Sequence, residues 1–245
     1  MISNDLLLLE VLIFLVIASI FLIVLLYKIN NYKKTAYYKS THLSYFQVMF
    51  DKGRLGEYYT YTYLKSLKGY KRYLFNCYLP KDNKTTTEID VILLHESGIY
   101  VFESKNYSGW IFGSETQKEW TQTLPTGRGR SHKSHFLNPI IQNKVHLKWL
   151  KSYLSDYPAI PFYSYIIFSD RCELKKITLT SREHHVINRY DIYKKVSANA
   201  AAAGKRLTQQ QIDEIYKKLY PLTQVKEALK LAHVENIQKT YHTPR

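Results

Sequence analysis

The chain has 245 residues, 45% of them hydrophobic and 22% charged, a balance that excludes an intrinsically disordered protein. Its formal net charge of +15 favours a polyanionic partner, either nucleic acid or the anionic surface of a membrane. The two cysteines, Cys77 and Cys172, stand far apart and belong to no CxxC motif, which excludes a zinc or redox site built on cysteine.

Residues 6–26 form an apolar segment that only Glu10 and Ser19 interrupt. As a helix, the segment spans roughly 31 Å, the thickness of the hydrocarbon core of a bilayer. A cleaved signal peptide needs basic residues before the apolar run and a small-residue cleavage site after it, and the sequence has neither. A buried core helix is the other alternative, and the scarcity of polar positions argues against it. We therefore predict that residues 1–27 are a transmembrane anchor whose residues 6–26 contact lipid.

The charges on either side of this segment predict its orientation. Asp5 precedes it, and four basic residues follow closely: Lys28, Lys33, Lys34 and Lys39. By the positive-inside rule, the N-terminus lies outside the cell membrane and the rest of the chain lies in the cytoplasm. Residues 28–45 are interpreted as a juxtamembrane connector, in which Tyr32, Tyr37 and Tyr38 are placed at the lipid interface.

The remainder is predicted to form one α/β domain over residues 46–220, followed by a C-terminal helix and tail over residues 221–245. Residues 46–68 begin this domain as an amphipathic helix, because apolar positions recur every four residues. These positions are Leu55, Tyr59, Tyr63 and Leu67. Residues 72–79 are predicted to form the first strand. Glu57 lies off the apolar stripe, where a solvent-exposed glutamate is the simplest interpretation.

Two strands follow, over residues 91–94 and 99–102, with charged residues at their outer ends. If Glu96 and Ser97 form a two-residue loop, the loop sets which positions lie opposite one another. The pairs are then Asp90 with Glu103 and Glu88 with Lys105. Directly opposed side chains have Cβ atoms roughly 5 Å apart, and two like charges there are destabilising unless a cation offsets them.

Asp90 and Glu103 are therefore the candidate metal ligands. Two carboxylates, supplemented by a backbone carbonyl and waters, make the oxygen-rich site that Mg²⁺ prefers. Lys105 lies two residues beyond Glu103 on the same strand face, where its ammonium can orient a water or steady a phosphate. The alternative is a half-exposed hairpin whose charges face solvent. Against it, residues 99–102 are apolar on both faces, as in a central strand.

Residues 126–135 are rich in glycine and basic residues and are predicted to form a mobile loop. Arg128, Arg130 and Lys133 are the candidate nucleic-acid-binding residues in this loop, as contacts to backbone phosphates. A solvated loop without a binding role is the alternative interpretation.

A helix is predicted next, over residues 139–154, since Asn138 is a favoured cap and Pro139 suits the first helical position. The side chains expected to face the core are Ile141, Val145, Trp149 and Leu154. Gln142 and His146 share a second face, on which Gln142 can bind a substrate phosphate or a metal-bound water. For His146 we expect a structural or solvent-exposed role.

The rest of the domain is predicted to continue the sheet and cover it. Residues 162–168 are expected to form a strand beside the hairpin, and residues 184–188 an edge strand. Helices are predicted over residues 189–203, 209–219 and 225–234.

Four motifs occur in order along this chain: Gly53-Arg54-Leu55-Gly56-Glu57, Glu88-Ile89-Asp90, Glu103-Ser104-Lys105-Asn106 and Phe136-Leu137-Asn138-Pro139-Ile140-Ile141-Gln142-Asn143. With them, the chain from about residue 43 to about residue 220 resembles the NERD family, the nuclease-related domain, which is placed in the PD-(D/E)xK nuclease superfamily. The resemblance implies a restriction-endonuclease-like α/β fold, with three layers, α/β/α, around a central mixed sheet.

The same resemblance implies roles for single residues. Asp90 and Glu103 would be the metal ligands, and Lys105 the catalytic lysine. Glu57 and Gln142 would be supporting polar residues of the catalytic site, supplied by two flanking helices.

The function expected from these observations is that of a membrane-anchored nuclease that hydrolyses DNA phosphodiester bonds with Mg²⁺ or Mn²⁺. One alternative is a non-catalytic module that tethers DNA or RNA at the membrane, because an intact site does not demonstrate turnover. Another is a protein-interaction scaffold whose basic residues contact lipid.

Overall fold

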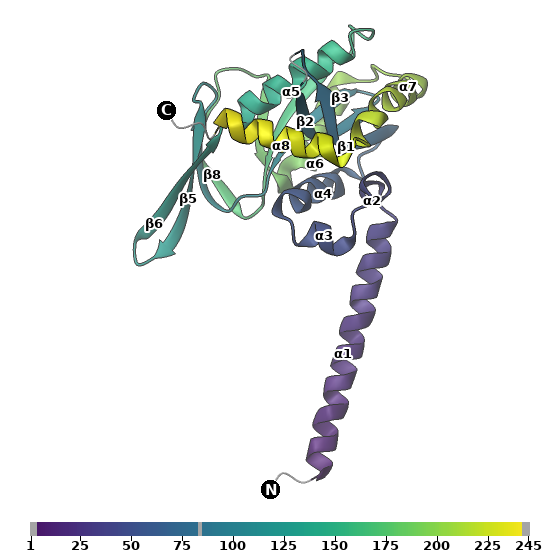
Figure 1. Ribbon diagram of the computed structural model, residues 1–245, viewed down its shortest axis with the longest axis vertical. Helices are drawn as coiled ribbons and strands as arrows, with labels where there is room; N and C mark the ends of the chain where they lie inside the picture. The colour runs from purple at the N-terminus through teal and green to yellow at the C-terminus, as the bar shows by residue number, and fades with distance from the viewer. Residues whose placement is uncertain (1–3, 83–84, 242–245) are drawn as a thin grey trace.

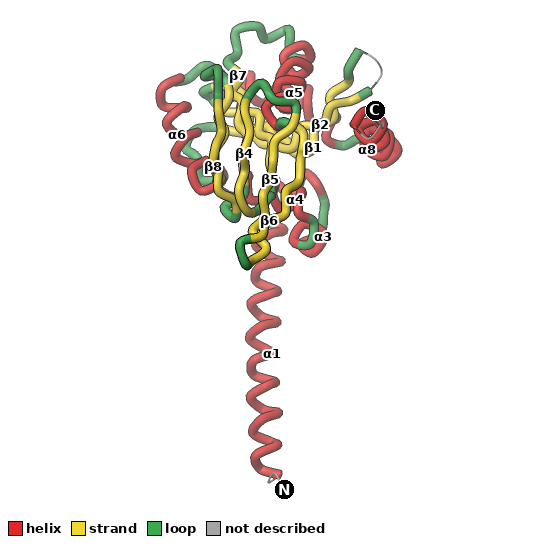
Figure 2. Tube along the Cα trace, turned by 90° about the vertical axis from the view of Figure 1, so that its left-hand side faces the viewer, coloured by secondary structure: helices red, strands yellow, loops and turns green. Residues whose placement is uncertain are grey.

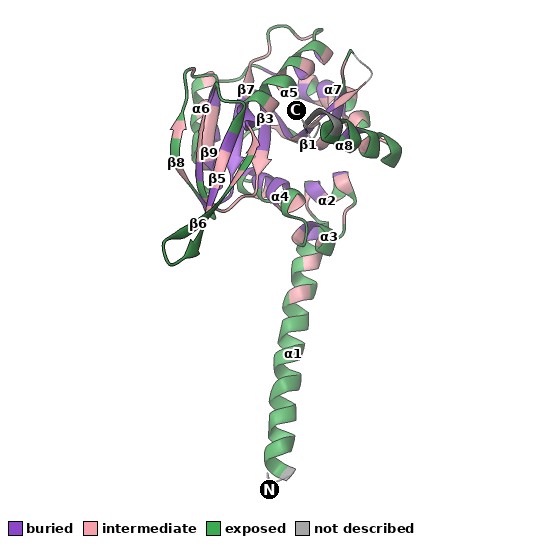
Figure 3. Cartoon of the chain, turned by 60° about the vertical axis from the view of Figure 1, so that its left-hand side comes forward, coloured by how far each residue is buried: buried purple, intermediate pink, exposed green. Residues whose placement is uncertain are grey.

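The computed structural model describes residues 4–82 and 85–241, so residues 242–245 of the predicted tail lie outside the described residues. A single long helix, α1 (Asn4–Lys33), projects from an α/β body (Figure 1). Its most apolar stretch has a mean hydropathy of 3.1 and is exposed along its whole length (Figure 3). By length and composition, α1 is able to cross a membrane.

The end of α1 and the two short helices after it belong to the body. These helices are α2 (Ala36–Thr41) and α3 (Tyr45–Met49). Tyr32 and Tyr37 are 1% and 0% exposed, so their predicted place at the lipid interface is wrong. Both rings can be buried because their hydroxyls have partners: Tyr32 donates to the Leu43 carbonyl at 2.8 Å, and Tyr37 donates to the Glu57 carboxylate at 3.0 Å.

The predicted helix over residues 46–68 is two helices, α3 and α4 (Lys52–Leu64). The break falls at Phe50 and Asp51. The Asp51 side chain caps α4 by accepting a hydrogen bond from the Arg54 amide at 2.9 Å, and a capping aspartate favours a fresh helix start over continuation.

Five strands form the central sheet, in the order β1-β2-β3-β7-β9. Their bounds are β1 (Lys71–Pro80), β2 (Thr86–His95), β3 (Gly98–Lys105), β7 (Phe162–Phe168) and β9 (His184–Asn188). The first three pair antiparallel, whereas β7 and β9 run parallel to β3, so the sheet is mixed as expected.

Helices cover both faces of this sheet (Figures 1 and 2). On one face, α4 and α6 (Ile192–Ala203) enclose an aromatic-rich core that includes Tyr61 and Phe102. On the other, α5 (Pro139–Tyr153) and α7 (Gln209–Leu219) enclose an aliphatic core that includes Leu150 and Ile212. The expected three-layer α/β/α arrangement is therefore confirmed. The short helices η1 (Arg189–Asp191) and η2 (Tyr220–Thr223) and the C-terminal α8 (Glu227–Tyr241) complete the described chain.

The sequence predicts two short strands, over residues 110–112 and 119–124, but not the second sheet of four strands to which they belong, in the order β6-β5-β4-β8. Its strands are β4 (Gly109–Ser114), β5 (Glu119–Gly127), β6 (Arg130–Leu137) and β8 (Cys172–Thr178). The predicted mobile loop over residues 126–135 is wrong, because β5 and β6 form a hairpin that projects from the body as an arm (Figures 1 and 3). Its turn has positive φ at Arg128 and Gly129, 48° and 73°, as two-residue hairpin turns require.

The inner face of α5 also differs from the prediction. Ile141 and Val145 are 41% and 38% exposed, while Asn143 and His146 face the sheet. The buried Asn143 amide donates to the Val101 carbonyl at 3.2 Å and to the Ser164 hydroxyl at 2.8 Å. Hydrophobic periodicity failed here because polar groups with partners occupy the buried side of the helix.

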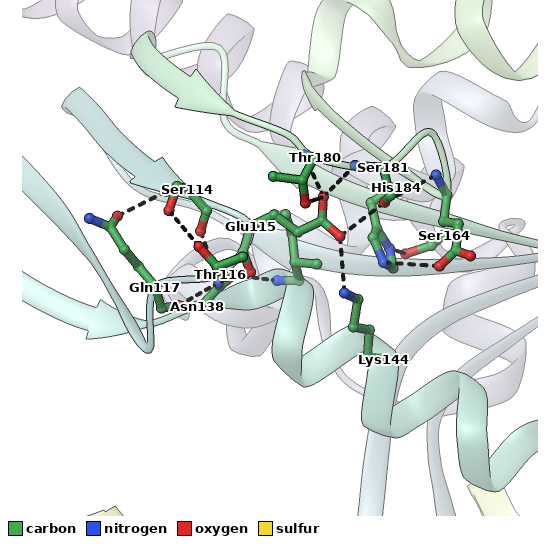
Figure 4. Close-up of polar contacts among 12 residues, drawn as sticks. Ser114, Glu115, Thr116, Gln117, Asn138, Lys144, Ser164, Thr180, Ser181 and His184 are labelled. Carbon is green, nitrogen blue, oxygen red and sulfur yellow. Dashed lines mark hydrogen bonds and ion pairs between the residues drawn. The ribbon is translucent and has the colours of Figure 1, made fainter.

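A buried carboxylate ties the second sheet to α5 (Figure 4). Glu115 follows β4 and is 5% exposed. It accepts hydrogen bonds from the Thr180 and Ser181 amides at 2.8 and 2.9 Å, and from Lys144 Nζ at 3.0 Å. Asn138, the cap of α5, donates to the Glu115 carbonyl at 3.0 Å. These contacts fix the start of α5 against the second sheet.

Replacing Gly113 with alanine is expected to lower the free energy of unfolding by roughly 1–3 kcal/mol, because overpacking a filled core costs this much. A Cβ at Gly113 would meet the ring of Trp120, which is fully buried and stacks on Phe168 with ring centroids 6.0 Å apart. Urea unfolding followed by tryptophan fluorescence measures the change. Gly53→Ala is the matched control, since its nearest neighbour, an Asp51 carboxylate oxygen, lies 3.3 Å away; equal losses in both variants would contradict the prediction.

Candidate active site

The hairpin of β2 and β3 has the predicted register, from His95 opposite Gly98 to Val91 opposite Phe102. The ladder ends there, one residue short of Asp90 and Glu103. The predicted pairs of Asp90 with Glu103 and of Glu88 with Lys105 are therefore absent from the ladder, and Glu88 pairs with Tyr78 of β1. From Val91 onwards β2 pairs with both β1 and β3, and before Val91 its backbone ladder is with β1.

Glu103 is the centre of the cluster and is 4% exposed. Its Oε1 lies 2.6 Å from Lys105 Nζ, and its Oε2 lies 3.0 Å from His146 Nε2. Burial alone would raise the pKa of Glu103, but Lys105 and His146 outweigh it and hold this pKa below its ordinary value. Burial likewise opposes the charge of Lys105, but Glu103 and Asp90 raise the pKa of its ammonium. Glu103 and Lys105 are therefore an ionised pair.

Asp90 lies beside this pair. Its Oδ2 accepts a hydrogen bond from the Ser104 amide at 2.8 Å. Pairing between β1 and β2 is interrupted here, where Asn76 of β1 adopts a φ of 49° that asparagine tolerates better than most residues. Burial, with the charges of Glu103 and Glu57, raises the pKa of Asp90 well above its ordinary value. These surroundings therefore favour the uncharged form of Asp90, and a bound cation would favour its charged form.

Glu57 reaches the cluster from α4. It is 8% exposed, so the interpretation as a solvent-exposed glutamate is wrong. Its Oε2 accepts hydrogen bonds from Tyr37 at 3.0 Å and from the Asn76 amide at 3.1 Å. Burial, followed by the charge of Glu88, raises the pKa of Glu57. The charge of Glu57 in turn acts on Asp90, which places both acids in one electrostatic unit.

A cavity of about 320 Å³ adjoins these acids. Glu57, Asn76 and Glu88 line one side, and Lys230 of α8 lines another. His233, also on α8, lies 3.7 Å from a Glu88 carboxylate oxygen. The cavity opens onto Glu57 and Glu88, whereas Asp90 and Glu103 are not part of its lining. Neither Asn76 nor His233 was predicted as a site residue, and both depend on long-range packing.

For His146 a structural or a solvent-exposed role was expected. The exposed role is wrong, because the side chain lies against Glu103. His146 Nδ1 lies 2.7 Å from the Thr87 hydroxyl, which fixes the ring between the two partners. Its four-residue spacing from Gln142 was the signal in the sequence that could have identified it. Gln142 lies one turn earlier on α5, and its Oε1 is buried without a hydrogen-bond partner in the part of the chain that the structure describes.

The structure does not bring the predicted nucleic-acid-binding residues to the carboxylates. Arg128, Arg130 and Lys133 are exposed on the β5–β6 arm, which extends away from the central sheet (Figure 3). At its end, β6 leads into α5 through Leu137 and Asn138.

Comparison with known proteins assigns this chain to a family. The model of the nuclease-related domain, NERD, matches residues 52–169, a range that contains Glu57, Asp90, Glu103 and Lys105. An uncharacterized protein of Bacillus anthracis, pXO1-01, is 30% identical over 191 residues, which make up 78% of this chain and 85% of that protein. The chain belongs to the NERD family. No solved structure matches the NERD chain.

A nuclease-related domain suggests dependence on a divalent metal ion in general. The donors of this NERD chain fit such an ion, because they are oxygens: the carboxylates of Asp90 and Glu103 and the unpartnered Gln142 Oε1. Within residues 4–82 and 85–241, no three Asp, Glu, His or Cys side chains converge to form a closed metal cage. Waters would complete the coordination, as is usual for Mg²⁺, and one contact of Glu103 would have to be shared with the ion.

If the NERD domain cleaves nucleic acid with a metal ion, His146→Ala is expected to lower the cleavage rate by roughly 10- to 100-fold, the usual cost of losing a group that orients a metal ligand. The physical reason is that Glu103 loses the partner of its Oε2. Initial cleavage rates at saturating metal ion measure the effect, with Lys148→Ala on the exposed face of the same helix as control. Unchanged rates in His146→Ala would show that Lys105 positions Glu103 alone.

Proposed function

We propose that this protein is a membrane-anchored, divalent-metal-dependent nuclease that hydrolyses DNA phosphodiester bonds. The observation that supports the proposal most is the convergence of Asp90, Glu103 and Lys105 at one end of a central hairpin, with Glu103 ionised and Lys105 charged beside it. An ordinary structural ion pair does not need a second buried acid next to it, because the like charges of the two carboxylates oppose folding.

In this proposal each side chain has a defined task. Asp90 and Glu103 hold Mg²⁺ or Mn²⁺, which when bound polarises the scissile phosphate and acidifies a water. Lys105, kept in place by Glu103, offsets negative charge on the phosphate. Glu57 and Gln142 complete the polar wall from the two flanking helices.

We further propose that Arg128, Arg130 and Lys133 contact the phosphate backbone of the nucleic acid from the β5–β6 arm. Their exposure and charge support this role, and phosphate contacts of this kind position a substrate without reading its sequence. Changing all three residues to alanine is expected to reduce the salt dependence of DNA binding.

The proposed location places residues 6–26 in the lipid of the cell membrane, the N-terminus outside and the body in the cytoplasm. Its support is the exposed apolar length of α1 and the lysines that follow it.

One experiment separates the catalytic proposal from its rivals. The full chain, purified in detergent, is incubated with linear, circular and single-stranded DNA and with RNA, in the presence of Mg²⁺, Mn²⁺ or a chelator. Cleavage that requires a metal ion supports the nuclease. Salt-sensitive binding without cleavage supports instead a module that tethers nucleic acid at the membrane, and the absence of both favours a protein-interaction scaffold.

A further inference from the structure

At the end of the body where α1 leaves it, two exposed aromatic side chains lie close together, Phe46 in α3 and Phe50 at its C-cap. Phe46 is 47% exposed and Phe50 is 84% exposed, and their rings stack with centroids 6.1 Å apart. The opposite side of α3 is anchored, since Val48 is fully buried. Because Ser44 and Gln47 form a capping box at the start of α3, the pair is presented by a defined helix and not by a loose segment.

This end of the body faces the direction in which α1 extends. Figures 1 and 3 show α3 close to the end of α1 that joins the body, beside α2. Tyr32 at the end of α1 packs edge-on against Tyr45 of α3, with ring centroids 5.7 Å apart. If α1 crosses a bilayer, the surface of that bilayer must lie opposite α3.

The charge of this end suits an anionic surface. Lys33, Lys34 and Lys39 are exposed on the segment that leads from the end of α1 through α2. The acidic neighbour Asp51 is engaged as the cap of α4. Each basic residue near an anionic leaflet adds to attraction, and aromatic rings favour the level of the lipid headgroups.

We propose that Phe46, Phe50, Lys33, Lys34 and Lys39 form a lipid-contact patch that rests on the anionic leaflet from which α1 emerges. The patch holds the body in one orientation, with α3 against the membrane and the α5–β7 connection away from it. This inference rests on the proposed membrane anchoring by α1 and is independent of nuclease activity.

The test uses the full chain with a single introduced cysteine, Phe50→Cys, labelled with an environment-sensitive NBD fluorophore. The two native cysteines are buried, and burial raises the pKa of Cys77 to about 12 and that of Cys172 to about 11, so the folded chain labels at the new thiol. Ser155→Cys, on the exposed α5–β7 connection at the far end of the body (Figure 1), is the matched control.

Each labelled chain is reconstituted in vesicles of phosphatidylcholine and phosphatidylglycerol that contain headgroup nitroxide lipids. The label at residue 50 is expected to emit at shorter wavelength and to be quenched at least about twofold more than the label at residue 155, as for a group at headgroup level. Changing the three lysines to glutamate is expected to reduce the difference. Equal quenching at both positions, with α1 still resistant to alkaline extraction, would overturn the patch. Alkaline extraction of the chain would overturn the proposed anchoring, and the patch with it.

Discussion

Asp90→Asn is expected to reduce metal-dependent DNA cleavage by roughly a hundredfold to a thousandfold, the scale of losing one electrostatic group that acts on the transition state. The substitution keeps the size of the side chain, and an amide oxygen can still accept the hydrogen bond from the Ser104 amide. It removes the charge with which Asp90 would hold a divalent ion. The fold should survive, because burial beside Glu103 and Glu57 already favours the uncharged form of Asp90.

Thermal unfolding separates loss of the metal ion from loss of the fold. In the absence of metal ion, Asp90→Asn and the unmodified chain are expected to unfold at similar temperatures. Addition of Mn²⁺ should raise the unfolding temperature of the unmodified chain, because an ion that binds only the folded state stabilises it. The variant should show little or no rise. Asp156→Asn, on an exposed side chain, is the control, and equal cleavage by all three proteins would refute the proposed role of Asp90.

Glu115→Gln is expected to lower the free energy of unfolding by about 2–4 kcal/mol, because several charge-assisted hydrogen bonds in a buried site lose their acceptor charge. Burial alone would raise the pKa of Glu115, but Lys144 and the donors of Thr180 and Ser181 hold it well below its ordinary value of 4.5. A carboxyl with a lowered pKa stabilises the fold above the pKa of the unfolded chain. That stabilisation is lost progressively as the pH falls towards the folded-state pKa.

The difference in unfolding free energy between the unmodified chain and Glu115→Gln should therefore shrink as the pH is lowered from about 6 to about 3. Urea unfolding at a series of pH values measures it. Glu183→Gln is the matched control. Glu183 lies in the connection between β8 and β9 that also contains Thr180 and Ser181, and its side chain is 79% exposed. A difference that is large at pH 6 and does not change with pH would show that packing, and not the charge of Glu115, accounts for the effect.

Local patterns were sufficient where a single short-range rule decides the outcome. The turn at Glu96 and Ser97 determined the register of the β2–β3 hairpin, and Asn138 with Pro139 determined the start of α5. The apolar length of residues 6–26 likewise identified a helix able to cross a membrane. These features depend on neighbours in the chain, so the sequence alone predicts them.

Long-range contacts decided the rest. The basic segment before α5 is a paired hairpin because Arg128 and Gly129 allow a tight turn, although its composition resembles that of a loop. His146 belongs to the site because α5 turns its polar face toward Glu103. Glu57 can be buried because Tyr37 and Asn76 donate hydrogen bonds to its carboxylate, which offset the cost of burying the charge.

The sequence by itself determined which residues carry the candidate chemistry: Asp90, Glu103 and Lys105. Only the tertiary structure decided their ionisation, because the pKa of each depends on burial and on charges brought from β2, β3, α4 and α5. The same holds for the exposed aromatic pair, Phe46 in α3 and Phe50 at its C-cap, because only the packing of α3 leaves both rings exposed on one end of the body.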